Sequence, residues 1–176
     1  MQAIPSDAQI SVWLNEHKPI PNDYAKWIGM LVPTLKDARQ LQYKPKVVKS
    51  VDGNSFLIYL RQNALDANNF SIGMNIFRKR GNSIALVRCN GWHDEHRNHL
   101  ERKRPDYKIP ENTCHVHVAK QRYLQFTGSK QIGYATPTNA YNSLGSALHY
   151  FVREFGFVSA NTLKPFEKYT LPLHWS

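Results

Sequence analysis

Five of the eight histidines in the chain fall within 25 residues of one another. They are His93, His96, His99, His115 and His117. The ordinary pKa of imidazole, about 6.5, lets a histidine accept or donate a proton near neutrality, and neutral imidazole is a common ligand of transition metals. The grouping therefore predicts a site for acid–base chemistry or for a metal ion.

The segment 113–119 predicts a strand that carries two of these histidines on one face. Cysteine and valine alternate with histidine along it, and successive side chains of a strand point to opposite faces. Because the apolar set is expected to face the core, we expect His115 and His117 to stand on the open face of a sheet.

A neighbouring strand, 83–89, is predicted to add a cation to that face. If its valine and cysteine face the core, Arg88 emerges on the same side as the two histidines. Asn75 and Arg61 are expected to do the same one and two strands away, respectively. The sequence thus predicts a sheet face that combines imidazole, guanidinium and amide groups.

Metal-independent cleavage of RNA is the first chemistry that suits this face. One imidazole takes the proton of the ribose 2′-hydroxyl, the other protonates the leaving oxygen, and Arg88 stabilises the charge on phosphorus. Because RNA supplies its own nucleophile, neither a metal nor another cofactor is expected. The candidate catalytic residues are His115, His117, Arg88, His93, His96 and Tyr123.

A metal site is the alternative chemistry. Zinc or another divalent ion held by His93, His96, His115 and His117 would activate a water molecule. Carboxylates, which nuclease metal sites often use, are sparse in this stretch, so the metal-independent hypothesis is preferred. A face of this composition can also bind nucleic acid by hydrogen bonding and stacking without cutting it.

The charge balance favours a polyanionic partner. Lysine and arginine number 23 against 13 acidic residues, which gives a formal net charge of +10, and such an excess attracts nucleic acid, either RNA or DNA. The basic stretch 97–108 and a second patch at 78–80 are the predicted phosphate contacts. The candidate nucleic-acid-binding residues are Arg78, Lys79, Arg80, Arg97, Asn98, Arg102, Lys103, Arg104, Lys108 and Arg122.

The hydrophobic patterning predicts an α+β fold in a single domain, 1–176. Residues 1–44 are expected to be helical, with one helix capped at Ser6 and a second that runs from near Asn22 and continues past Pro33 to Leu41. An antiparallel four-stranded meander is expected within 45–120. A covering helix at 138–156, capped by Thr138 or Asn139 and ended by Gly156, and an extended tail at 157–176 complete the prediction.

The remaining features predict an intracellular protein. No run of about 18 apolar residues is present, so no membrane helix is expected, and the N-terminal residues lack the pattern of a signal peptide. Two cysteines are too few for a disulfide framework. A reduced, cytoplasmic setting is therefore expected.

Three motifs resemble a family of small proteins of bacteria and mobile elements for which no activity is established. They are Arg-Cys-Asn-Gly-Trp-His-Asp-Glu-His-Arg-Asn at 88–98, His-Val-His-Val-Ala-Lys-Gln-Arg-Tyr at 115–123 and Gly-Tyr-Ala-Thr-Pro-Thr at 133–138. This chain has Lys-Gln at 120–121 where the family pattern has Thr-Glu. The resemblance implies that the following residues form one unit: Arg88, His93, His96, Asn98, His115, His117, Arg122 and Tyr123.

Helices followed by an antiparallel meander on a small basic chain also resemble the metal-independent ribonuclease toxins of toxin–antitoxin pairs. The leading hypothesis is therefore a small endoribonuclease of toxin or defence type, with an acidic antitoxin-like protein as a second partner. A non-catalytic nucleic-acid-binding or inhibitor protein is the alternative. The sequence makes no prediction about oligomeric state.

Overall fold

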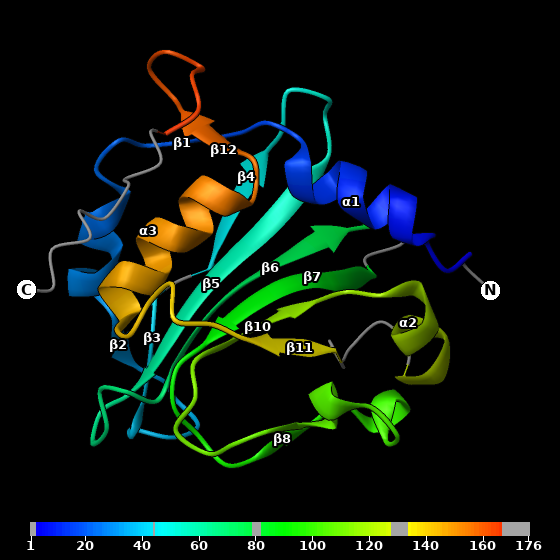
Figure 1. Ribbon diagram of the computed structural model, residues 1–176. Helices are drawn as coiled ribbons and strands as arrows, with labels where there is room; N and C mark the ends of the chain where they lie inside the picture. The colour runs from blue at the N-terminus through cyan, green and yellow to red at the C-terminus, as the bar shows by residue number, and fades with distance from the viewer. Residues whose placement is uncertain (1–2, 44, 79–81, 128–133, 167–176) are drawn as a thin grey trace, which may run out of the picture.

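The architecture is α+β, as predicted, with helices packed on an antiparallel sheet (Figure 1). This computed structural model describes residues 3–43, 45–78, 82–127 and 134–166. The predicted meander is confirmed, since each of its four strands is antiparallel to the next. These strands are β5 (Ser55–Asn63), β6 (Phe70–Phe77), β7 (Ser83–Asn90) and β10 (His115–Val118).

Four shorter strands extend the meander to a sheet of eight strands within the described residues. Strand β11 (Ala135–Pro137) pairs with β10, and β2 (Val32–Pro33) pairs with β3 (Gln40–Gln42). Both β3 and β4 (Lys46–Lys49) pair with β5. None of these four short strands shows an alternation long enough to be recognised from sequence.

The prediction for residues 1–44 is only partly right. Helix α1 (Asp7–Asn15) begins where expected, and the Ser6 hydroxyl accepts a hydrogen bond from the Gln9 amide at 3.1 Å. The second helix is a 3₁₀ helix, η1 (Tyr24–Met30), and its predicted continuation to Leu41 is wrong. Pro33 has no N–H to continue a helical ladder, and the residues beyond it pair with β5 instead.

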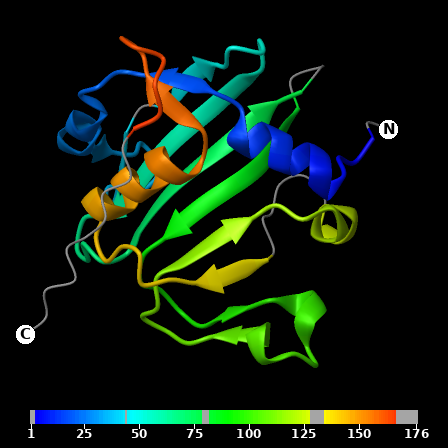
Figure 2. The ribbon, with the colours of Figure 1, turned by 45° about the horizontal axis from the view of Figure 1, so that its top comes forward.

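Helix α3 (Leu144–Glu154) covers one face of the sheet together with α1, as both ribbon views show (Figures 1 and 2). It begins later than predicted, because Ser143 rather than Thr138 or Asn139 caps it, in a reciprocal capping box with Ser146. Gly156 follows its end with a positive φ of 72°, as predicted. Among the described residues, no helix has the length and apolar character needed to cross a bilayer.

A second, parallel pairing joins residues near the two ends of the described chain. Strand β1 (Lys18–Ile20) lies beside β12 (Phe157–Ser159), the first part of the expected extended tail. Lys18 is fully buried, and its Nζ donates to the carbonyl oxygens of Trp13 at 3.0 Å and Leu14 at 3.2 Å. The ammonium group thus satisfies backbone acceptors at the C-terminal end of α1.

The connection between β7 and β10 comprises residues 91–114, of which 91–112 are termed the covering segment. It contains β8 (His96–Arg97), η3 (His99–Glu101), η4 (Pro105–Tyr107) and β9 (Lys108–Ile109), with β8 and β9 paired as a small hairpin. In Figure 2 it lies beside the β11 edge, away from α1 and α3. This segment places two further histidines next to the sheet.

Candidate histidine site

Strands β7 and β10 bring the predicted arginine and histidines onto one face of the sheet. In the antiparallel register His117 lies opposite Arg88, and His115 lies opposite Asn90. The intervening Val116 packs into the hydrophobic core on the other face. The shared face predicted for Arg88, His115 and His117 from period-two alternation is confirmed.

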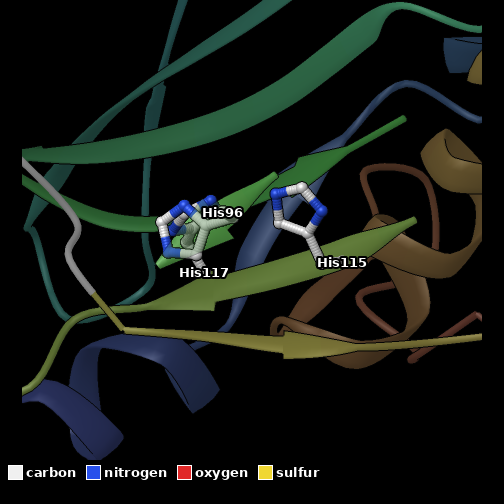
Figure 3. Close-up of side chains that lie close together, drawn as sticks. All are labelled: His96, His115 and His117. Atoms are coloured by element: carbon white, nitrogen blue, oxygen red, sulfur yellow. The ribbon is translucent and has the colours of Figure 1, made fainter. Parts of the chain in front are cut away.

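The covering segment adds His93 and His96, so that four imidazoles gather in one cluster. Ring centroids of His93 and His115 lie 4.6 Å apart, those of His96 and His117 also 4.6 Å, and those of His115 and His117 5.0 Å. Figure 3 shows His115 and His117 projecting from β10 with His96 beside His117. The four residues are termed the histidine cluster.

The expectation that His115 and His117 stand on an open face is wrong. Their exposed fractions are 2% and 0%, because the covering segment lies over them on the side away from the core. His93 and His96 are half-buried and are the members of the cluster nearer to solvent. The histidines occupy a second, polar interior of the molecule rather than the hydrophobic core.

Hydrogen bonds to backbone carbonyls fix the tautomers of two members. His115 Nδ1 lies 2.8 Å from the Thr113 carbonyl oxygen, and His93 Nδ1 lies 2.9 Å from that of Asp94. A carbonyl oxygen only accepts, so each Nδ1 carries the hydrogen and each neutral ring presents the lone pair of Nε2 to the cluster. Burial lowers the pKa of His115 to about 4, so this ring is neutral at physiological pH.

The amide of Asn90 lies at the centre of the cluster. Its Nδ2 is 3.1 Å from His93 Nε2, 3.2 Å from His115 Nε2 and 3.3 Å from His117 Nε2. Its Oδ1 is buried and has no hydrogen-bond partner among the described residues. Asn90 is a site residue that was not singled out from the sequence, although its position two residues after Arg88 puts it on the same face.

Arg88 lies at the edge of the cluster. Its Nη2 is 3.4 Å from His117 Nε2, whereas its buried Nε has no acceptor within the part of the chain that the structure describes. Gly73 lies opposite Arg88 in the neighbouring strand β6, and the ring of Tyr59 packs against it. A side chain at position 73 would clash with that ring, because its β-carbon would overlap the Tyr59 ring atoms. Tyr59 is a second site residue that sequence reasoning missed. Arg61 lies on the same face, as predicted, and its Cζ is 5.2 Å from the centroid of the Tyr59 ring.

No protein-family model matches this chain, and no curated protein or solved structure is significantly similar to it. The site is therefore interpreted from its geometry alone.

Tyr123 and Arg122, expected to belong with the histidines, lie in a different cluster. Both are on helix α2 (Gln121–Thr127), and Arg122 forms an ion pair with Glu101 of the covering segment. The buried Tyr123 hydroxyl donates to Glu101 Oε1 at 3.4 Å. These contacts attach the covering segment to the body of the protein.

Asn98, expected to contact nucleic acid, is fully buried and serves as an anchor instead. Its Nδ2 donates to the carbonyl oxygens of Asp106 at 2.7 Å and Ala135 at 2.9 Å. The Ala135 amide donates back to Oδ1 at 2.7 Å. The side chain thus ties the covering segment to strand β11.

The covering segment is less basic than its run of arginines and lysines indicated, since it contains five basic and five acidic residues. Glu95 pairs with Arg97 at 2.6 Å and with Lys108 at 3.3 Å, and Arg104 lies 3.4 Å from an oxygen of Asp106. Arg102 and Lys103 are exposed. Most of the charge of this segment is therefore used internally.

The second predicted basic patch lies at the hairpin between β6 and β7. Arg78 stacks over the ring of Trp13, with 5.1 Å between its Cζ and the ring centroid. Arg78 follows the end of β6, whereas Arg88 pairs with Gly73 in the middle of that strand. The two arginines therefore lie at different positions along the strands. Lys79 and Arg80 fall outside the described residues.

Replacing Asn98 with alanine should lower the free energy of unfolding by about 2–3 kcal/mol, because three buried hydrogen bonds are lost together. Urea denaturation measures the change, with the exposed Asn161→Ala as the matched control. Hydrogen exchange of the covering segment should accelerate in the Asn98 variant alone. Equal stability of both variants would contradict the anchoring role.

Proposed function

We propose that the protein is a nuclease that cleaves RNA at the histidine cluster. The observation that carries this proposal is Arg88, whose buried Nε lacks an acceptor among the described residues while its Nη2 lies beside His117. Phosphate oxygens are the preferred partners of a guanidinium that still has donors to offer. A buried polar atom with no partner in a native structure calls for such an explanation.

The half-exposed sheet face next to the cluster supports a nucleic-acid substrate. Arg61 and Tyr59 lie on it in a cation–π contact, and Tyr59 reaches across Gly73 towards Arg88. A single strand of RNA laid across β5, β6 and β7 would meet Arg61 and then Arg88 before it reached the histidines. The net charge of +10 would draw the strand to the protein.

The cluster supplies imidazoles that can move protons during cleavage. His115 is held neutral by burial, and the hydrogen bond from its Nδ1 to the Thr113 carbonyl sets the tautomer, so its Nε2 offers a lone pair and is unsuited to donate a proton. The acid that protonates the leaving oxygen is then another member of the cluster. This revises the sequence-based hypothesis, in which His115 and His117 shared the two roles as an exposed pair.

A labelled RNA of about 20 nucleotides and single-stranded DNA of the same sequence test the proposal in parallel, each with and without EDTA. We expect cleavage of RNA and analyse the new ends. A 2′,3′-cyclic phosphate reports attack by the ribose hydroxyl, whereas a 3′-hydroxyl reports attack by water. RNA that stays intact in every tube would overturn the proposal.

Complete burial of His115 and His117 favours a second candidate, a nucleic-acid-binding or inhibitor protein without cleavage. It predicts RNA binding that weakens steeply with salt and is unchanged when both histidines are replaced by glutamine.

In the toxin version of the first proposal, an acidic antitoxin-like protein would cover Arg61 and Arg88 and prevent RNA from binding. A competition assay between that protein and RNA would reveal this.

A further inference from the structure

We infer that the histidine cluster is a binding site for one divalent transition-metal ion, ligated by His115 and His117 from β10 and completed by His93 and His96 from the covering segment. The inference rests on the arrangement of nitrogen atoms and stands whether or not the protein cleaves RNA. If the protein does both, the ligated imidazoles would no longer move protons, and a water activated by the ion would replace that step of the cleavage.

The strongest argument is the meeting of two lone pairs. His93 and His115 each donate their Nδ1 hydrogen to a carbonyl oxygen, so neither neutral ring has a hydrogen on Nε2. Those two Nε2 atoms nevertheless lie only 3.1 Å apart. Two lone pairs at that distance repel each other unless a positive charge lies between them, which either a proton shared by the two rings or a bound metal ion would supply.

The Asn90 amide cannot satisfy the cluster by itself. Its Nδ2 carries two hydrogens but lies within 3.3 Å of the Nε2 atoms of three histidines, while its own Oδ1 is buried without a partner among the described residues. The imbalance disappears if a cation occupies the cluster, because the imidazoles then need no hydrogen from the amide. The amide oxygen would then be able to turn toward the cation or toward a water bound to it.

The distances between nitrogen atoms suit a small ion. Ligands at about 2.0–2.1 Å in a tetrahedron around zinc lie roughly 3.3–3.4 Å from each other, close to the 3.1 Å between His93 and His115. Possible ligand atoms of His96, His115 and His117 all lie within 4.8 Å of one another. Binding of an ion would draw these nitrogens closer together than they are in this structure.

The surroundings of the rings are those of metal ligands. A histidine that binds a metal usually donates its other N–H to a carboxylate or backbone carbonyl, which fixes the ring, and the carbonyls of Thr113 and Asp94 do this here. The ligand set contains nitrogen alone. Such sites select zinc, cobalt, nickel, copper or iron over magnesium and calcium, which prefer oxygen.

Cobalt titration of the full-length, EDTA-treated protein tests the inference without RNA. We expect one Co²⁺ per chain, visible-region absorption typical of nitrogen coordination, displacement by Zn²⁺ and a higher melting temperature in the presence of either ion. Mg²⁺ should produce none of these effects. A folded protein that takes up no Co²⁺ or Zn²⁺ would overturn the inference.

Variants locate the ion. His117→Gln should weaken Co²⁺ binding at least ~100-fold, since changes outside the ligand set already cost 10–100-fold. His93→Ala, at a half-buried position, repeats the test where folding is less at risk. The control is His99→Ala, an exposed histidine of the same covering segment. Wild-type affinity in both cluster variants, or equal loss in the control, would refute the assignment.

The readouts separate this inference from the proposed function. Stoichiometric Co²⁺ binding without RNA cleavage supports the metal site and overturns the nuclease. Cleavage that survives EDTA, in a protein that binds no Co²⁺, supports the nuclease and overturns the metal site.

Discussion

Cleavage of RNA should fall by at least about 10³-fold when His117 is replaced by glutamine, the largest loss expected for a single substitution. Positioned acid–base groups contribute about 10²–10⁴-fold to such reactions. His117 also contacts two further polar side chains of the site, those of Asn90 and Arg88. Its Nε2 lies 3.3 Å from Asn90 Nδ2 and 3.4 Å from Arg88 Nη2. Single-turnover rates on labelled RNA measure the effect.

His99→Gln is the matched control, since it makes the same substitution at an exposed position of the covering segment. We expect its rate to stay within about twofold of wild type, the neutral range for a surface change. Thermal melting of both variants shows whether lost activity reflects unfolding. A folded His117→Gln protein with a rate within tenfold of wild type would remove His117 from the mechanism.

Arg88→Ala should lower kcat by about 10²–10³-fold, comparable to the removal of one preorganised donor to a developing negative charge. Arg88→Lys should recover part of the loss, because an ammonium keeps the charge but lacks the planar fork that binds two phosphate oxygens. The steady-state rates of the two variants measure the difference.

Arg153→Ala, on α3 and hence on the opposite face of the sheet, provides the comparison for Arg88. Both substitutions remove one positive charge, so any general decrease in attraction for RNA appears in both. A kcat for Arg88→Ala equal to that of Arg153→Ala would show that Arg88 acts only through net charge.

The sheet and the shared face were predictable because both depend on local periodicity. Period-two alternation in 55–63, 70–77, 83–90 and 115–118 identified the strands and placed Arg88, His115 and His117 on one side. The same alternation puts Asn90 and Tyr59 on that face. Neither an amide nor a phenol side chain by itself indicates a catalytic or metal site, so their residue types did not mark Asn90 and Tyr59 as part of one.

Burial of the site was not predictable because it depends on contacts between distant residues. The covering segment is fixed by Asn98 against Ala135 and by Glu101 against Arg122, pairs separated by more than 20 positions. Ion pairs within the segment, of Glu95 with Arg97 and Lys108 and of Asp106 with Arg104, explain why most of its positive charge is neutralised. The helix predicted to reach Leu41 does not form for a related reason, since residues 40–42 pair as a strand with β5, which lies later in the chain, and with β2.

The pairing of β1 with β12 limits how the molecule can be divided. A fragment that contains β7 and β10 but ends before Phe157 would leave β1 unpaired and would expose Lys18, whose ammonium group now lies 4.8 Å from the ring centroid of Phe56. Grafting the histidine site onto another scaffold would therefore require residues from about Ser6 to Ser159, rather than β7, β10 and the covering segment alone. Shortened versions for display or crystallisation have the same lower limit.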